Sequence, residues 1–369
     1  MKTYQLKFLA WTFSAFLPPD DGVRVGLGMA ALGRPGYINL HRETHLSSRT
    51  VDDMRETAHK VIDELFRRCS ELNNAGTADL KLVPWLDCAR SYGLSEEFVG
   101  DYLRRNNISS EDVYVSSKWG YTYVANWNVE LGEGEPHEIK DHSLENFMKQ
   151  VEETKSHIGP YVNLYQVHSA TFDSGVLTNT HLHEALHRIC RVENGWSIGL
   201  SVSGPNQGDV IRESLKLRVP ISDDNDNNLQ QQQTQQRLFD SVQCTYNILE
   251  QRPYEALIDA HKAGIDIIIK EGLANGRALL HPKLIQISHE LDCKPDQLAL
   301  GAILSQPFQP RVLSGAVSVE QLGSNMSSLD VQEIFISSKA GQLSLDRLMC
   351  DCRIESEAYW KDRSALKWN

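Results

Sequence analysis

The chain has 369 residues, of which 41% are hydrophobic, 8% aromatic and 23% charged, and its formal net charge is -12. These values are typical of one large globular domain or two modest ones, whose core needs no disulfide or metal. The negative charge argues against nucleic acid or an anionic membrane as the main partner. The seven cysteines are scattered and form no CxxC pair, which is typical of a protein kept reduced in the cytoplasm.

The N-terminal segment, residues 1–21, contains the apolar run FLAWTFSAFL behind two lysines and so has some features of a targeting leader. Trp11, Thr12 and Ser14 interrupt that run, and no small-residue cleavage site follows it. An apolar strand or plug is therefore the alternative interpretation. No apolar run approaches the ~20 residues that span a bilayer, which argues against a membrane-embedded protein.

Eight short apolar runs alternate along the chain with helical patterns. The runs are rich in β-branched residues and rarely alternate with polar ones, which is typical of strands buried on both faces. They cover residues 23–27, 80–86, 113–116, 162–167, 197–202, 241–245, 265–269 and 311–313. The helices are expected over residues 50–72, from Ser95 onward, and over 143–158, 179–190, 208–217, 253–263, 283–304 and 319–329.

This alternation predicts an α/β fold, a (β/α)8 or TIM barrel forming a single domain over residues 22–338. A doubly wound parallel sheet shares the local pattern and is the alternative. Residues 223–236, DDNDNNLQQQQTQQ, predict a disordered low-complexity insert before the sixth strand. Residues 339–369 form a C-terminal extension that is aromatic enough to pack back onto the barrel.

The stretch VGLGMAALGRPG, residues 25–36, satisfies the G-x-G-x-x-A spacing of a dinucleotide-binding fingerprint. A Rossmann loop needs a helix that opens at the second glycine, but Gly33, Pro35 and Gly36 break any helix here. In the barrel interpretation Gly28, Met29 and Ala30 form the loop after the first strand. Small residues in that loop let the backbone approach a ligand closely.

Four reactive side chains follow consecutive predicted strands. The second strand ends in LDCARSYGLSEE, with Asp87 and Tyr92, the third in VSSKWGY, with Lys118, and the fourth in LYQVHSA, with His168. Strand ends carry the active site in such barrels. Lys118 is expected to lower the pKa of Tyr92, and Asp87 is expected to balance the charge of Lys118. His168 is expected to orient a carbonyl oxygen, which Tyr92 then protonates.

Each of these residues also has a structural interpretation when taken alone. An aspartate at a strand end caps helices, a tyrosine packs, a terminal lysine extends to water, and a histidine in an apolar run is a hydrogen-bonded core residue. Their joint position at neighbouring strand ends favours catalysis.

Six motifs, DCARSYGLSE, SSKWG, LYQVHSA, IGLSVSG, VQCTYN and LSGAVSVEQLGSN, resemble successive motifs of the aldo-keto reductase superfamily. They occur in the family's order between residues 23 and 325. The resemblance implies that Asp87, Tyr92, Lys118 and His168 are that family's catalytic tetrad. It also implies a (β/α)8 enzyme that reduces an aldehyde or ketone with a nicotinamide cofactor, or oxidises an aldose or alcohol in the reverse direction. The partner is then a small carbonyl compound or sugar.

The same resemblance implies a set of cofactor and substrate contacts. Ser201 and Gln243 are expected to bind the nicotinamide carboxamide, and Trp119 and Tyr121 to line the substrate pocket, although Trp119 has rim packing as an alternative. The full set of expected cofactor contacts is Gly28, Met29, Ala30, Asp87, Ser201, Gln243, Lys270, Gly272, Leu273, Gly315, Ala316, Gln321 and Asn325.

Three positions depart from the family pattern. Val202 stands where an asparagine often contacts the carboxamide, and Lys270 stands where an aromatic ring stacks on the nicotinamide. Gln321 occupies a position where an arginine often binds the 2′-phosphate, which weakens the preference for NADP over NAD. NADP is the expected cofactor and NAD the alternative.

Two competing functions stay open. HEALH, residues 183–187, matches the H-E-x-x-H zinc-peptidase pattern on a predicted helix, but it lacks a third ligand, and a solvated histidine pair on the outer ring is the favoured interpretation. A barrel of this kind can also serve as a redox-sensing subunit that binds the cofactor without catalysis.

Overall fold

The computed structural model describes residues 22–40, 46, 48–75, 81–220 and 235–369. The predicted leader and most of the predicted low-complexity insert therefore lie outside the described residues. In the described part of the chain, no helix has the length and apolar character needed to cross a membrane.

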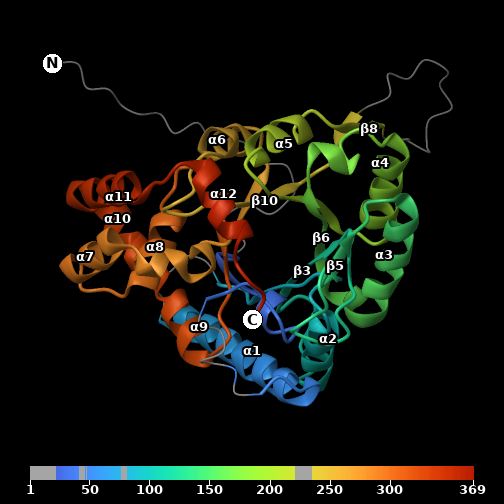
Figure 1. Ribbon diagram of the computed structural model, residues 1–369, viewed down its shortest axis with the longest axis horizontal. Helices are drawn as coiled ribbons and strands as arrows, with labels where there is room; N and C mark the ends of the chain where they lie inside the picture. Colours follow the sequence, from blue (N-terminus) through green and yellow to red (C-terminus); the bar gives the residue numbers. More distant parts are fainter. Residues whose placement is uncertain (1–21, 41–45, 47, 76–80, 221–234) are drawn as a thin grey trace.

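Eight parallel strands close into a barrel surrounded by helices, which confirms the predicted (β/α)8 fold and excludes the open doubly wound sheet (Figure 1). The order around the barrel is β1-β12-β11-β10-β7-β6-β3-β2. The strands are β1 Val25–Gly28, β2 Trp85–Asp87, β3 Tyr114–Trp119, β6 Val162–Ala170, β7 Ser197–Val202, β10 Ser241–Thr245, β11 Asp266–Lys270 and β12 Arg311–Ser314.

Two antiparallel hairpins lie outside the barrel. One joins β4 Tyr121–Tyr123 to β5 Glu138–Lys140 in the loop after β3. The other joins β8 Arg218–Pro220 to β9 Gln235–Arg237, so the last two residues of the predicted insert, Gln235 and Gln236, lie in a strand.

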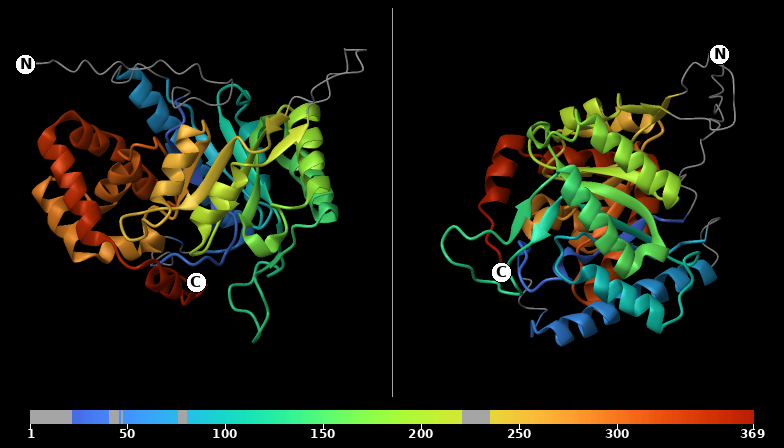
Figure 2. Two further views of the ribbon diagram at one scale, coloured as in Figure 1. Left: turned by 90° about the horizontal axis from the view of Figure 1, so that it is seen from above. Right: turned by 90° about the vertical axis from the view of Figure 1, so that its right-hand side faces the viewer.

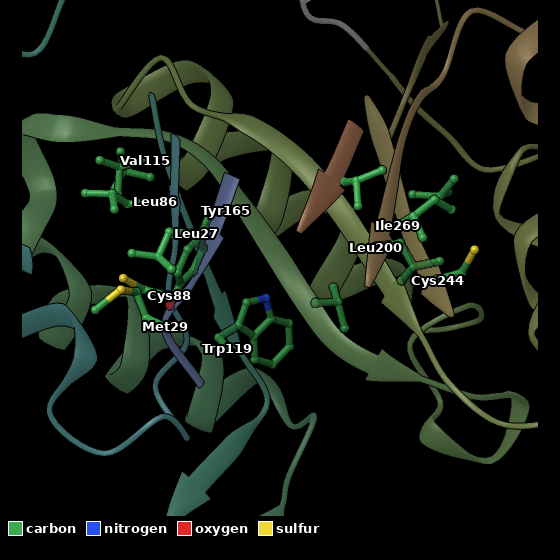
Figure 3. Packing of buried hydrophobic residues seen from close by; sticks show 14 of the residues in the cluster. Leu27, Met29, Leu86, Cys88, Val115, Trp119, Tyr165, Leu200, Cys244 and Ile269 are labelled. Carbon is green, nitrogen blue, oxygen red and sulfur yellow. The ribbon is translucent and has the colours of Figure 1, made fainter. Parts of the chain in front are cut away.

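Side chains alternate between the two faces of each strand, because successive residues of a strand point in opposite directions. One set packs outward against the helices in the main core cluster, which includes Leu27, Leu86 and Val115 (Figure 3). The other set forms a separate interior cluster of Val23, Trp85, Tyr114, Leu164, Ile268 and Leu313. This interior cluster fills the floor of the barrel and leaves the carboxyl ends of the strands as its mouth.

The helices begin where the sequence supplies caps. The Thr50 side chain accepts a hydrogen bond from the Asp53 amide at the start of the first helix, and Ser143 does the same for Asn146. The helices are α1 Val51–Asn74, α2 Ser95–Arg105, α3 Leu144–Ile158, α4 Thr180–Leu186, α5 Gln207–Ser214, α6 Tyr254–Lys262, α7 Pro282–Glu290, α8 Pro295–Leu304, α9 Val319–Met326, α10 Ser328–Ser337, α11 Lys339–Cys352 and α12 Ser356–Ser364.

The single helix expected over residues 283–304 is wrong, because the chain forms α7 and α8 instead. Between them Asp292 has φ 51° and Pro295 starts the new helix. Proline lacks an amide hydrogen and disfavours helical geometry at the residue before it, so Pro295 ends one helix and begins another. With α10 and α11, these helices form a second apolar core beside the barrel (Figure 1).

The C-terminal extension forms α11 and α12, and α12 lies over the barrel mouth (Figures 1 and 2). The terminal Asn369 exchanges backbone hydrogen bonds with Tyr37, at 2.9 and 3.1 Å. The Trp368 ring stacks on His137 with the ring centroids 4.1 Å apart. The end of the described chain is thus attached to two loops of the mouth.

Replacing Gly26 by alanine should destabilise the barrel. A Cβ at residue 26 would lie 2.3 Å from Cε3 of Trp85, which fills the floor. We expect the free energy of unfolding, measured by chemical denaturation, to fall by about 2–3 kcal/mol. Gly28→Ala is the matched control, since its nearest new contact is 3.4 Å from the Ser314 carbonyl oxygen. Equal stability of the two variants would contradict this packing.

Candidate active site

Asp87 and Lys118 form an ion pair inside the barrel mouth, where both residues are almost completely buried. Lys118 Nζ donates hydrogen bonds to Asp87 Oδ2 and to the Cys88 carbonyl oxygen, the latter at 2.9 Å. Ser116 Oγ donates to Asp87 Oδ1 at 2.7 Å and accepts from Trp85 Nε1 at 2.9 Å. The pair is therefore desolvated, mutually neutralised and hydrogen-bonded to the floor of the barrel.

Tyr92 lies beside this ion pair, in the loop after β2. Lys118 Nζ is 4.9 Å from the centroid of the tyrosine ring, and Arg34 Cζ is 5.3 Å from it. Burial raises the pKa of the Tyr92 hydroxyl well above its usual value, and the Asp87 charge acts in the same direction. The shift is opposite to the lowering expected from Lys118, because burial is its largest cause. Tyr92 consequently holds its proton at neutral pH.

His168 faces Tyr92 from β6, with the two ring centroids 5.5 Å apart. Its Nδ1 lies 3.4 Å from Ser91 Oγ. Burial lowers the pKa of the imidazole well below its usual value, and the charges of Lys118 and Lys270 add to this effect. A neutral imidazole has one N–H donor and one acceptor nitrogen, so His168 can donate a hydrogen bond to a carbonyl oxygen without carrying charge.

A cavity of about 650 Å³ opens at this mouth and extends between β11, β12 and the start of α9. It brings together Asp87, Tyr92 and His168 of the predicted tetrad, while Lys118 lies behind Asp87. The predicted cofactor contacts that line it are Gly28, Ala30, Asp87, Gln243, Lys270, Gly272, Leu273, Gly315, Ala316, Gln321 and Asn325.

Two predicted contacts lie elsewhere. Met29 and Trp119 have no exposed surface and belong to the main core cluster (Figure 3), so the structure does not bring them to the cavity. Trp119 follows Lys118 on β3, and because Lys118 points into the barrel, Trp119 must point outward. There it packs on Phe147 with the ring centroids 5.0 Å apart. The alternation of inward and outward side chains along β3 is the sequence signal that predicts a packing role for Trp119.

Two other predicted residues lie next to the cavity without lining it. The Tyr121 ring packs against His168 at 5.1 Å between centroids. Ser201 is fully buried on β7, and its hydroxyl is one of the buried side-chain groups that make no hydrogen bond within the described structure.

The cavity wall contains charged residues that the sequence analysis missed. Arg34 Nη1 donates to Glu138 Oε2 at 2.8 Å and to the Ser91 carbonyl oxygen at 2.7 Å. The ring of Trp368 lies 4.6 Å from Arg34 Cζ. These residues come from three distant segments, so only the fold brings them together.

A second such pair joins α12 to β11. Arg363 Nη2 donates to Glu271 Oε1 at 2.7 Å, and Glu271 directly follows the cavity residue Lys270. The position of Glu271 at a strand end was a usable signal, whereas nothing near Arg363 in the sequence indicates its place at the mouth.

The residues present fit a dinucleotide. The hydroxyl of Ser201, which lacks a partner among the described groups, and the amide of Gln243 offer both donors and acceptors, as a carboxamide requires. Gly28, Gly272 and Gly315 leave backbone exposed along the cavity wall. The part of the cavity between β12 and α9, which we call the adenosine arm, could accommodate the adenosine half.

The first four residues of the HEALH motif lie on α4 and His187 follows its last residue, away from this cavity. His183 is buried, and its Nε2 is 2.6 Å from the Val176 carbonyl oxygen, so the expected solvated pair is wrong for this residue. Among the described residues, no three or more His, Cys, Asp or Glu side chains form a group that could hold a metal ion.

His142 makes stability dependent on pH. Its Nε2 lies 2.8 Å from the His168 carbonyl oxygen, and burial lowers its pKa from 6.5 to about 4. Below the usual pKa the unfolded chain binds a proton that the folded chain does not, so stability is lost on acidification. This residue should account for a loss of about 2 kcal/mol between about pH 7 and pH 5.

Denaturant unfolding of His142→Gln over that pH range should show a correspondingly shallower decline. The exposed His181→Gln is the matched control and should keep the wild-type profile. An unchanged slope in His142→Gln would contradict the assignment.

Comparisons with known proteins agree with this geometry. A family model described as the Aldo/keto reductase family matches residues 72–337. No curated protein sequence matches the chain. Similar solved structures include aldo-keto reductase AKR11C1 from Bacillus halodurans in its holo form, with a TM-score of 0.58 and 20% identity over 88% of this chain and 91% of that chain. Another is MGS-M4, an aldo-keto reductase from a Medee basin deep-sea metagenome library, with a TM-score of 0.53 and 15% identity over 90% of this chain and 91% of that one.

At these identities the structural likeness establishes the fold. The family model covers well over half of the sequence, including the segments that carry Asp87, Tyr92, Lys118 and His168. The chain therefore belongs to the aldo/keto reductase family of oxidoreductases.

Proposed function

We propose that the protein reduces an aldehyde or ketone with NADPH, or with NADH as the alternative, and that the same site can oxidise an aldose or alcohol in reverse. The observation that supports this most strongly is geometric: Tyr92 lines the cavity beside the buried Asp87–Lys118 pair and faces His168, with the two ring centroids 5.5 Å apart. A phenol carries its proton at neutral pH and can transfer it to a carbonyl oxygen held within hydrogen-bond distance.

When bound, the reduced nicotinamide supplies a hydride to the carbonyl carbon. Ser201 and Gln243 would hold its carboxamide, and Gly28 and Ala30 would lie against its ribose. The remaining contacts would follow the arm toward the adenosine half: Gly272, Leu273, Gly315, Ala316, Gln321 and Asn325.

The protein's own residues manage the proton. His168 donates a hydrogen bond to the carbonyl oxygen and fixes its position, and Tyr92 transfers its phenolic proton to that oxygen. Lys118, 4.9 Å from the ring centroid, stabilises the resulting tyrosinate until it recovers a proton from water. Asp87 holds Lys118 in place. The carbon has then gained a hydride and the oxygen a proton, which gives the alcohol.

The charged residues of the adenosine arm support only a modest difference in affinity between NADPH and NADH. Lys294 lines this arm together with Asp296 and Glu320, so one cation stands among two carboxylates. A 2′-phosphate gains little from that balance, and both NADPH and NADH should bind. We place the protein in the cytoplasm because all seven cysteines are free.

The alternative function is a redox-sensing subunit that binds the cofactor and a protein partner without turnover. It uses the same cavity, so binding of the cofactor alone does not distinguish the two functions. Turnover on a carbonyl panel does.

Tyr92→Phe should keep cofactor binding and lose turnover by about 10²–10⁴-fold, because it removes the proton donor and little volume. The measurement is cofactor affinity by fluorescence titration, followed by consumption of NADPH on aldehydes, ketones and sugars. The matched control is Tyr102→Phe on α2, whose hydroxyl donates to Asp63 Oδ1 at 2.7 Å outside the cavity. Unchanged turnover in Tyr92→Phe would refute the tyrosine's role. A wild-type protein that binds the cofactor but reduces no carbonyl would support the sensor function instead.

A further inference from the structure

We propose that Lys270 makes the site bind the reduced nicotinamide in preference to the oxidised one. The inference rests on the proposed function, because it concerns the ring that would occupy the same cavity. Such a preference would load the site with the hydride donor and release the spent cofactor, as a reductase requires.

The position of Lys270 follows from the barrel. It is the last residue of β11 and pairs in register with Thr245 of β10. Three strands separate β11 from β3 in each direction around the barrel, so Lys270 lies across the mouth from Lys118. Both Lys270 and Tyr92 line the cavity. A ligand that spans this mouth therefore meets Tyr92 on one side and Lys270 on the other.

The nicotinamide belongs on the Lys270 side. Its proposed carboxamide partners, Ser201 and Gln243, lie on β7 and β10, and β7, β10 and β11 are consecutive neighbours in the barrel. Tyr92, in the loop after β2, and His168, on β6, each lie three strands away from β11 and remain for the carbonyl oxygen. The ring is thus next to Lys270, and the substrate next to the proton donor.

The ammonium of Lys270 is an unbalanced charge. It makes no hydrogen bond or ion pair with any residue that the structure describes. The neighbouring Glu271 is held by Arg363 through Oε1, and Lys118 is paired with Asp87. Among the described residues, Glu271 is the carboxylate whose charge acts on Lys270, and it is already paired with Arg363.

The two redox forms differ in charge at this ring. The oxidised ring is a cation and the reduced ring is neutral, while their phosphates are identical. A nearby ammonium repels the oxidised ring, strongly so at the low effective dielectric of a buried site, and exerts no such repulsion on the neutral reduced ring. This charge difference changes the ratio of the two dissociation constants. Contacts that the two redox forms share cancel in that ratio.

The preference should disappear at alkaline pH. Burial lowers the pKa of Lys270 to about 8, with Arg363 and Lys118 acting in the same direction and Glu271 opposing them. The pKa of His168 lies well below 6.5, that of Cys244 is raised to about 12, and that of Tyr92 lies well above 10.

The remaining charges near Lys270 do not change in this interval. The pKa of Glu271 is lowered, Arg34 and Arg363 are permanent cations, and Asp87 stays bonded to Lys118. Lys270 is therefore the facing group that loses its charge between neutral pH and about pH 9, and the repulsion goes with it.

The experiment compares the dissociation constants of NADP⁺ and NADPH, by fluorescence titration at about pH 7 and about pH 9, in wild type and Lys270→Met. At neutral pH the oxidised-to-reduced ratio should be about tenfold smaller in Lys270→Met than in wild type. The wild-type ratio should fall toward the variant's value at alkaline pH. Lys294→Met, which removes a cavity lysine beside the adenosine arm, is the matched control and should leave the ratio unchanged.

A second variant keeps the test decisive if Lys270→Met does not fold. Lys270→Arg retains its charge at both pH values, so its ratio should stay high at about pH 9 while that of wild type falls. A ratio that neither substitution nor pH changes would overturn the preference. That result would follow if Lys270 instead paired with a phosphate or a substrate carboxylate, whose charge is the same in both redox states. Failure of wild type to bind either nucleotide would refute the proposed function itself.

Discussion

The buried ion pair between Asp87 and Lys118 is the interaction on which the rest of the site depends. Placing two charges inside the barrel mouth costs several kcal/mol for each, and only close pairing with further hydrogen bonds offsets that cost. Ser116 and the Cys88 carbonyl oxygen supply those bonds, and Ser116 is in turn bonded to Trp85 in the floor. One network thus links the packing that closes the barrel to the position of a charged group beside Tyr92. Burial raises the pKa of this tyrosine most, and the Asp87 charge acts in the same direction.

The mouth is completed by segments that are far apart in the chain. Arg34 follows the first strand, Glu138 lies in the hairpin after the third, and Trp368 is next to the end of the described chain, yet all three meet above Tyr92. Arg363 on α12 reaches Glu271 on the opposite side. The tetrad depends on strand ends, whereas the shape of the cavity above it depends on how the C-terminal helices return. In the proposed function, the chemistry therefore rests on the strand ends, and the shape of the substrate site rests on the C-terminal helices.

The barrel and its reactive residues could be predicted because each follows from local rules. Buried parallel strands appear as short β-branched runs. Asp87 and His168 follow such runs directly and Tyr92 lies in the loop after Asp87, so the closed barrel brings them to one cavity. The break at Pro295 also had a local signal, which the apolar period across 283–304 obscured. Strand alternation would likewise have assigned Trp119 to the outer core. No local rule could place Arg363 or Trp368, because their contacts depend on tertiary packing of a segment beyond the last barrel unit.

The most direct test of this account is the ionisation of Tyr92 with and without its acidic neighbour. The measurement is the absorbance of tyrosinate against pH, taken as the difference between matched proteins with and without Tyr92→Phe, in wild type and in Asp87→Asn. Removing the Asp87 charge should let tyrosinate form at a lower pH than in wild type, because that charge helps to raise the pKa of Tyr92. Ionisation of Tyr92 at the same pH in both backgrounds would contradict the control of the proton donor by the buried ion pair.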